Sequence, residues 1–457
     1  MAKVFSVNQD SIENNLSPNY YIFKRIIDDY SKRQDVISFS LGDEGVLKKL
    51  TDGEHAGQTF ASSGALFIKN SSVKRNSINL FDGFYISNEK NESLKRSILK
   101  KDDVLFTTIG NVGVSSLVNE NVEGANINQN VVTMRIDSSY CTPEYLSCYL
   151  NSKLVKFQVD SLFSGNIYPM LSYPKIKNIK VFVKSRDIEK EVTSLVRESN
   201  KLEIKSLGLI KKAQELFDEE INGAILKKEY NKKSFYVNYT QFESSNLFTP
   251  MYFLPEIVEN IESVKNSFKW KYLGDIVKFK KGDEPGSDNY IDYKESKDND
   301  YPFIRTSDIV NYDIDLYPDF FLKKNIFDDL NQDIKTEEVL FSKDGKIGEV
   351  SMITPFDKCV LGSGFLRICA IEKEINPYYL FIALTNELIG KKQAAQRTVI
   401  ASTIPHIRED RIADFIIPFV SKYDDIVKLT KEAFKLKNER KIIISKINKI
   451  IEMSLDY

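Results

Sequence analysis

A regular spacing of apolar and small residues marks the stretch from residue 186 to about residue 225. The spacing alternates steps of four and three, at Ile188, Val192, Leu195, Ser199, Leu202, Ser206, Leu209, Ala213 and Leu216. Such steps keep one narrow face of a helix apolar, so the pattern predicts a long helix with a coiled-coil stripe. The stretch contains no proline, and Gly208 is its weakest position. A stripe this narrow needs a partner helix to cover it.

The C-terminal stretch, residues 424 to 455, supplies that partner. Its stripe follows the same steps, at Ile426, Leu429, Ala433, Leu436, Arg440, Ile443, Ile447 and Ile450. The two stripes predict an antiparallel helix pair within one chain. A helix of roughly 40 residues is about 60 Å long at about 1.5 Å per residue. Arg440 is the one charged residue in the stripe. If the register is right, it should face an acid such as Glu203 or Glu215.

An internal repeat divides the rest of the chain. Residues 103–114 (DVLFTTIGNVGV) match residues 338–349 (EVLFSKDGKIGE) at an offset of 235, and residues 165–171 (GNIYPML) match residues 401–407 (ASTIPHI) at an offset of 236. Matches in one order at nearly one offset indicate two copies of one module. Each copy shows a helical lead, strand-rich segments ending in glycine turns, a helix that starts at a proline (Pro143 or Pro377) and a last strand.

The predicted fold is therefore α+β, with two tandem α/β modules held apart by an antiparallel pair of long helices. The predicted boundaries are a first module at 1–185, a central helix at 186–226, a second module at 227–420 and a C-terminal helix at 421–457. The basic linker at 227–238 is the domain boundary between the central helix and the second module.

Composition narrows the class of protein. The 457 residues are 42% hydrophobic and 28% charged, with a net charge of −1, which is typical of globular proteins with room for several cores. Since no global positive charge attracts nucleic acid, a nucleic-acid surface must arise from local clustering. The four cysteines form no CxxC pair and have no nearby histidine, so neither a zinc site nor a disulfide framework is expected. No stretch is long enough to span a membrane, and no leader is seen, so a cytoplasmic protein is expected.

The sequence offers no catalytic motif. It lacks an N/D-P-P-Y/F stretch for methyl transfer to an amine, and it lacks a GxGxxG loop after a strand. The two histidines, His55 and His406, fall in different modules, so a shared metal or catalytic pair is not expected. We expect no enzymatic activity, no cofactor and no metal.

Polar and basic residues beside the turns are the candidates for contact with DNA. Lysine and arginine suit phosphates or guanine, and asparagine suits adenine. In the first module the candidates are Lys69, Asn70, Lys74, Arg75, Thr107, Thr108, Asn111, Asn128, Asn130, Ser164, Asn166 and Tyr168. In the second module they are Lys281, Arg305, Ser307, Lys343, Lys346, Arg397, Ser402, Thr403, His406 and Arg408. Residues of these types are also common on ordinary protein surfaces. Gly110, Gly113, Gly345 and Gly348 are interpreted as turn glycines, because they lack the lysine pattern of a phosphate loop.

The order of these features resembles the specificity subunit of type I restriction–modification systems, and the related recognition subunit of type IIB systems. The resemblance rests on LTDGEH at residues 50–55, the two repeated stretches, the proline loops, and the strands IKVFV and FIIPF that precede the long helices. One departure is that DGEH occurs only in the first half, where the second half has KKGDEP at residues 280–285.

The resemblance implies a non-catalytic subunit that recognises a split DNA sequence. Its implied partners are double-stranded DNA, two adenine DNA methyltransferase subunits docked on the charged faces of the helices, and a restriction or translocase subunit. Physical reasoning agrees, because two unlike modules on a rigid spacer suit an asymmetric target with two half-sites. Two other classes use the same architecture: a stand-alone DNA-binding regulator and a protein-binding adaptor. A neighbouring methyltransferase gene, or co-purification with a methyltransferase, distinguishes them.

Overall fold

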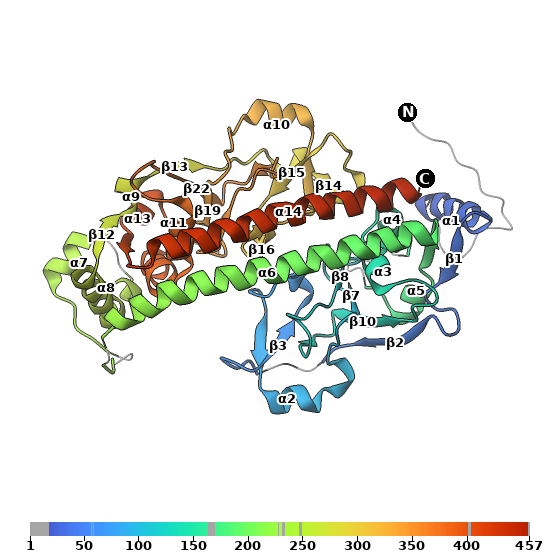
Figure 1. The fold of residues 1–457 in the computed structure, drawn as a ribbon, viewed down its shortest axis with the longest axis horizontal. Coiled ribbons are helices and arrows are strands. Elements are labelled where there is room, and N and C mark those ends of the chain that lie inside the picture. The colour runs from blue at the N-terminus through green and yellow to red at the C-terminus, as the bar shows by residue number, and fades with distance from the viewer. Residues whose placement is uncertain are drawn as a thin grey trace. The chain divides into compact units, whose positions relative to one another are not determined.

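Contacts along the chain define two units in the computed structural model. The structure describes residues 18–55, 57, 59–162, 170–226, 228–230, 234–245, 249–400 and 404–455. Unit 1 comprises residues 1–204 and 440–457, and unit 2 comprises residues 205–439. The division cuts both long helices, α6 (Arg186–Ala224) and α14 (Tyr423–Leu455), near their middles. Each unit therefore consists of one repeat together with one half of each long helix (Figure 1).

Unit 1 is built on a four-stranded antiparallel sheet. Its order is β2 (Leu47–Asp52), β10 (Val131–Ile136), β7 (Val104–Thr107) and β8 (Ser115–Leu117). A smaller sheet follows, in the order β6 (Phe84–Ile86), β3 (Ala65–Ile68) and β9 (Asn126–Ile127), with β3 and β9 parallel. Two short pairs complete the strands: β1 (Ile37–Ser40) with β11 (Lys180–Val183), and the hairpin β4 (Val73–Lys74) with β5 (Ser77–Ile78). The helices are α1 (Pro18–Ser31), α2 (Asn88–Ser93), α3 (Pro143–Leu150), α4 (Lys153–Ser161) and α5 (Tyr173–Lys177).

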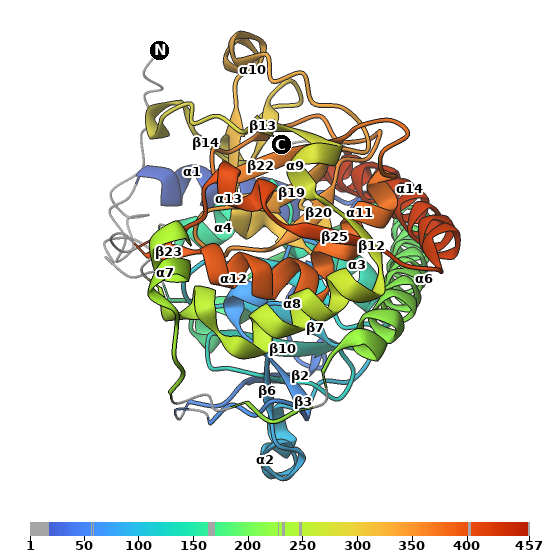
Figure 2. The same cartoon turned by 90° about the vertical axis from the view of Figure 1, so that its left-hand side faces the viewer.

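Unit 2 repeats this topology. The main sheet has the order β13 (Val277–Lys281), β22 (Phe365–Ala370), β19 (Val339–Ser342) and β20 (Val350–Met352). The second sheet has the order β14 (Ile291–Asp292), β18 (Phe320–Leu322), β15 (Tyr301–Ile304) and β21 (Val360–Leu361), with β15 and β21 parallel. The short pairs are β12 (Lys269–Tyr272) with β25 (Ile416–Phe419), β16 (Ile309–Val310) with β17 (Asp313–Ile314), and β23 (Val399–Ile400) with β24 (Pro405–His406). Figure 2 shows this unit with α7 (Tyr239–Ser245), α8 (Pro255–Ser267), α9 (Leu273–Ile276), α11 (Pro377–Thr385), α12 (Gln393–Arg397) and α13 (Glu409–Ala413).

The predicted mixed fold and internal repeat are thus confirmed, strand by strand. Matching residues also make matching bonds. The Tyr145 hydroxyl donates to the carbonyl of Phe182 at 2.7 Å, and the Tyr379 hydroxyl donates to the carbonyl of Pro418 at 2.6 Å. Each bond fastens a proline-initiated helix to the last strand of its module.

Local capping explains where the proline-initiated helices begin and end. The side chain of Thr142 accepts from the N–H of Tyr145 at the start of α3, and Pro143 occupies the first turn. In unit 2 the sequence predicts one helix from 377 to 390, but α11 ends at Thr385. The side chain of Asn386 accepts from two backbone N–H groups of the following π-helix, Glu387–Lys392, so a new helical segment starts there.

The helix halves run antiparallel within unit 1. Glu191 pairs with Lys446 at 2.8 Å, and Glu203 pairs with Arg440 at 3.3 Å, so the residue number rises along α6 as it falls along α14. The acid expected opposite Arg440 is therefore Glu203. In unit 2, the Glu220 carboxylate accepts from the N–H groups of Ser421 and Lys422 at the start of α14, where a negative charge is favourable.

The buried stripe of each long helix agrees with the predicted stripe at alternate positions. At the other positions, the next residue along the helix is buried instead. In α6 the buried residues of the stripe are Val192, Val196, Ser199, Glu203, Ser206, Ile210, Ala213, Phe217 and Ile221. In α14 they are Ile426, Thr430, Ala433, Lys437, Arg440, Ile444, Ile447, Ile451 and Leu455, and Phe434, Leu436 and Lys441 are buried beside them. The predicted positions that are only half-buried are Ile188, Leu195, Leu202, Leu209, Leu216, Leu429, Ile443 and Ile450.

This shift has a physical cause. A free-standing helix pair buries only a two-position seam, whereas each half-helix here also packs against its own module and needs a wider apolar face. In unit 1, Val192, Val196, Ile447 and Ile451 belong to the same core as the sheet residue Phe106. At every second position of the stripe, the buried residue is therefore the one that follows the predicted residue.

Candidate nucleic-acid interface

Four loops meet at one end of the sheets in unit 1. They are residues 53–55 after β2, 69–70 after β3, 108–113 after β7 and 128–130 before β10, and together we call them the loop end of unit 1. Hydrogen bonds join them. The Asn70 amide donates to the carbonyl of Ile109 at 3.1 Å, and the N–H of Thr108 donates to the carbonyl of Asn130 at 2.9 Å. Residues far apart in sequence are thereby held side by side.

Unit 2 has an equivalent loop end, formed by residues 281–284, 305–307, 343–348, 362–364 and 404–408. The N–H of Lys343 donates to the carbonyl of Gly364 at 2.8 Å, and the N–H of Ile407 donates to the carbonyl of Lys343 at 2.9 Å. The N–H of Gly345 donates to the carbonyl of Pro405 at 2.9 Å. The proline loop of the second copy is thus part of the same cluster.

One glycine in each loop end is required by close backbone contact. A Cβ atom on Gly53 would lie 1.8 Å from the carbonyl oxygen of Ile127, and one on Gly282 would lie 2.1 Å from that of Gly362. The DGEH and KKGDEP stretches, which differ in sequence, therefore occupy the same structural place. Each continues into an isolated parallel bridge, Glu54 with Asn128 and Asp283 with Gly362.

Asp52 organises the DGEH turn. Its carboxylate lies 2.7 Å from His55 Nε2 and 3.1 Å from the guanidinium of Arg96, and its N–H donates to the Tyr173 hydroxyl at 2.7 Å. Partial burial opposes ionisation, but the hydrogen bonds from Tyr173 and His55 and the charge of Arg96 lower the pKa of Asp52 overall. His55 is accordingly tied to the turn by a hydrogen bond.

Most of the candidate DNA-contact residues that the structure describes belong to a loop end. In unit 1 these are Lys69, Asn70, Asn111, Asn128 and Asn130, and in unit 2 they are Lys281, Arg305, Ser307, Lys343, Lys346, His406 and Arg408. Several of the cations are already paired: Lys281 with Glu409 at 3.7 Å, Lys346 with Glu349 at 3.0 Å and Arg408 with Asp410 at 3.0 Å. The structure thus gathers residues that the sequence presents as separate stretches.

Two of the candidates, Thr107 and Thr108, are buried in the structure. The hydroxyl of Thr107, which is fully buried, donates to the carbonyl of Asn111 and accepts from the N–H of Val114. Thr108 is 4% exposed. Ser342 makes the same two bonds in unit 2, with Lys346 and Glu349. The hydroxyl groups of Thr107 and Ser342 thus bond to the backbone of the glycine loops.

Three other candidates lie away from the loop ends. Lys74 and Arg75 belong to the β4–β5 hairpin, whose next residues, Asn76 and Ser77, contact Asn448 and Glu203 on the long helices. Arg397 ends α12 and donates to the carbonyl of Gln393 and the side chain of Gln396. The remaining candidates, Ser164, Asn166, Tyr168, Ser402 and Thr403, lie outside the described residues.

Beside each loop end lies an aromatic cluster, and a cation of the loop end rests on it; the sequence did not predict this feature. In unit 1 Lys69 Nζ lies 3.5 Å from the ring centre of Phe84 and 4.7 Å from that of Phe60. In unit 2 the guanidinium carbon of Arg305 lies 4.6 Å from the ring centre of Phe320. The repeat itself could have revealed this feature, because FIK at residues 67–69 and FIR at residues 303–305 share the 236-residue offset of the proline loops.

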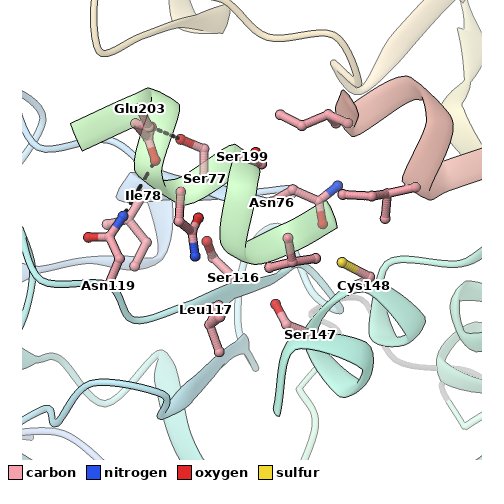
Figure 3. A pocket seen from close by; sticks show the side chains of 14 residues that line it. Asn76, Ser77, Ile78, Ser116, Leu117, Asn119, Ser147, Cys148, Ser199 and Glu203 are labelled. Carbon is pink, nitrogen blue, oxygen red and sulfur yellow. Dashed lines mark hydrogen bonds between the residues drawn. The ribbon is translucent and has the colours of Figure 1, made fainter. Parts of the chain in front are cut away.

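No metal site emerges from the described residues. Within the part of the chain that the structure places, no three His, Cys, Asp or Glu side chains form a group that could hold a metal ion. A cavity of about 20 Å³ lies beside α6 in unit 1, and its polar lining residues include Asn76, Ser77, Asn119 and Glu203 (Figure 3). It has room for about one water molecule. No described helix is long and apolar enough to cross a membrane.

The chain thus has two mixed modules of one topology, each with a loop end and each followed by a long helix. Residues 265–451 match a family model described as the type I restriction modification DNA specificity domain. The match covers less than half of the chain and lies in the second copy of the repeat. It confirms the resemblance seen in the sequence, and it supports a DNA sequence-recognition subunit of a restriction–modification system.

Two solved structures match nearly the whole chain at low sequence identity. The S subunit of a type I restriction–modification system from M. genitalium is 14% identical, with a TM-score of 0.35 over 92% of this chain and 95% of that one. The HsdS subunit from Thermoanaerobacter tengcongensis is 13% identical, with a TM-score of 0.29 over 93% of this chain and 96% of that one. A comparison with curated protein sequences gives no significant match.

Proposed function

We propose that the chain reads an asymmetric, bipartite DNA target, with one half-site contacted by the loop end of each unit. The observation that carries the proposal is a shared loop scaffold with different side chains. Lys69 and Asn70 of unit 1 correspond to Arg305 and Thr306 of unit 2, and His55 corresponds to Glu284. Since base edges are distinguished by the donors and acceptors that face them, unlike side chains on like loops favour two different half-sites.

In this proposal the chain has no catalytic activity of its own, and it positions the catalytic subunits on the DNA. Two adenine methyltransferase subunits dock on the long helices, and a restriction subunit joins the same complex in the cytoplasm. Methyl transfer to an adenine requires the base to leave the helix and enter a catalytic pocket. The chain's own role is to bind phosphates and base edges and to hold the catalytic subunits over the site.

The continuity of α6 and α14 supports a second part of the proposal, in which the helices set the gap between half-sites. Seven residues inserted after Ile204 and seven after Glu439 keep the apolar face in register. They lengthen both helices by about 10 Å at about 1.5 Å per residue. At about 3.4 Å per base pair, the gap should grow by about three base pairs.

Long-read sequencing of methylated bases tests both parts in a strain carrying this gene and its methyltransferase. The expected result is a motif with two unlike halves, whose gap widens in the double-insertion variant. A matched control places the same seven residues after Tyr236, an exposed linker residue, and should leave the gap unchanged. If the double-insertion variant still methylates the original motif, the long helices do not set the gap between the half-sites. A chain that needs no methyltransferase to bind its site indicates a stand-alone regulator instead.

A further inference from the structure

The aromatic cluster of unit 1 is assembled by backbone pairing. Phe60 packs on Phe84 with ring centres 4.4 Å apart, and on Phe67 at 6.2 Å. The next residue, Ala61, forms a backbone bridge with Tyr85 on β6. Phe60 and Phe84 are about 40% exposed, so the cluster forms part of the surface of the loop end.

Unit 2 builds the same cluster in the same register. Tyr290 packs on Phe303 at 4.9 Å and on Phe320 at 5.1 Å. The next residue, Ile291, pairs with Phe321 on β18, as Ala61 pairs with Tyr85 on β6. The two units thus share three rings and one cation at equivalent places: Phe67 and Phe84 of unit 1 correspond to Phe303 and Phe320 of unit 2, and Phe60 corresponds to a tyrosine, Tyr290.

The cations of the two clusters differ in their acidic neighbours. The Arg305 guanidinium lies 3.5 Å from the carboxylate of Asp308 and 3.7 Å from that of Asp319. For Lys69, by contrast, the described residues place no carboxylate within ion-pair distance, and its ammonium is held by the two rings. A ring face attracts a cation without adding a negative charge, so Lys69 keeps its full positive charge and N–H donors for an anion.

We propose that Lys69 anchors unit 1 to a DNA phosphate, and that the matching Arg305 of unit 2 is neutralised by its own carboxylates. The inference rests on the proposed function, because the anion is taken to be the DNA backbone at the loop end. It goes beyond that function by assigning unequal electrostatic roles to equivalent positions. Unit 1 supplies a salt-sensitive contact at this place, and unit 2 relies there on contacts of another kind.

The salt dependence of DNA binding measures such contacts directly. Each neutralised phosphate adds about 0.9 to the slope of log K against log salt on B-form DNA. Lys69→Gln should therefore make the slope shallower by about 0.9. Between 50 and 200 mM salt, the advantage of the original chain over K69Q should shrink by roughly threefold. Lys69→Arg should keep the slope, since it keeps the charge.

The experiment uses the full-length chain with its methyltransferase partner, bound to a fluorescent duplex that carries the methylated motif. Lys48→Gln is the matched control: Lys48 is in the same unit but is paired with Asp137 at 2.8 Å, outside the loop end. K48Q should leave the slope unchanged. Arg305→Gln should change the slope by less than about a third of the K69Q effect, and Asp319→Asn should steepen it by exposing the charge of Arg305.

The outcomes separate this inference from the proposed function. Normal binding by K69Q with an unchanged slope overturns the phosphate anchor and leaves DNA recognition standing. Equal slope changes in K69Q and R305Q overturn the asymmetry. A complex that binds no duplex at any salt concentration refutes the proposed function, and the phosphate anchor with it. Equal melting temperatures of the variants establish that the slopes report binding rather than folding.

Discussion

The ion pair between Glu203 and Arg440 joins the two long helices inside unit 1. The side chains are 7% and 9% exposed, and their charged atoms lie 3.3 Å apart. Arg440 also donates to the carbonyl of Asn76 at 3.2 Å, and Glu203 accepts from the Ser77 hydroxyl at 3.0 Å. The pair therefore fastens the β4–β5 hairpin to both helices, beside the small cavity shown in Figure 3.

Removing one partner should leave a buried charge without compensation. Such a loss costs about 3–5 kcal/mol, whereas replacing both partners by apolar residues of similar volume is close to neutral. Glu203→Met and Arg440→Met should each destabilise unit 1 by about that amount. The double variant should recover most of the loss, giving a coupling energy of roughly 3 kcal/mol or more.

The sequence provides a probe that separates the two units. Trp270 is the only tryptophan and lies in unit 2, so its fluorescence follows that unit, whereas far-UV circular dichroism follows both. One kcal/mol shifts the melting temperature of a unit of this size by about 2–4 °C. In E203M the first circular-dichroism transition should fall by roughly 6–20 °C, while the tryptophan transition remains in place.

Two results would refute this reasoning. A single variant within about 1 kcal/mol of the original chain would show that the charges are solvated and contribute little, as in surface pairs. A double variant as unstable as the sum of the two singles would show that each residue acts through packing alone. Lys446→Met removes the exposed partner of Glu191 on the same helix, and it should cost less than about 1 kcal/mol.

Two further predictions concern single positions. Gly53→Ala forces a Cβ against the carbonyl of Ile127, so it should destabilise unit 1 by about 1–3 kcal/mol and weaken DNA binding. The control is Gly57→Ala, whose Cβ meets no atom within 4 Å. In the same melting and binding assays, the control should change neither stability nor binding. Burial, followed by the nearby Glu338 carboxylate, raises the pKa of the Cys369 thiol to about 11. Alkylation by iodoacetamide at pH 8 should therefore be roughly a hundredfold slower than for an ordinary thiol, and it should accelerate as pH rises toward 11, because the thiolate is the reacting form. A rate at pH 8 equal to that of the urea-unfolded chain would contradict the shift.

Much of the fold could be predicted because its determinants are local or repeated. Helix periodicity from residue 186 and from residue 424 depends on spacing alone, and it predicts α6 and α14 to within a residue or two. The internal repeat is recognised from sequence stretches that match at nearly one offset. Capping at Thr142 and Pro143 is also local. For Arg440 the helix register and the need to compensate a buried charge predicted an acid such as Glu203 or Glu215, and the structure gives Glu203.

The candidate site was less predictable, because exposure depends on residues far away in the chain. Thr107 and Asn111 look alike as polar residues beside a glycine turn, yet Thr107 is buried at the end of β7, where its hydroxyl satisfies backbone groups, and Asn111 is exposed. Arg75 looks like a phosphate ligand, but its hairpin turns toward the long helices. The ring beneath Lys69 comes from β6, fifteen residues further along the chain, and spacing alone does not indicate it.

The sequence by itself determined the two copies, the order of elements within each, the two long helices and the resemblance to restriction–modification specificity subunits. These follow from periodicities and repeated motifs, which are properties of neighbouring residues. Only the tertiary structure decided which face of each long helix is most deeply buried, because packing against the modules widens the buried stripe. It also decided which polar residues share a loop end and which cation has a carboxylate within ion-pair distance among the described residues, because those outcomes depend on strands brought together from distant parts of the chain.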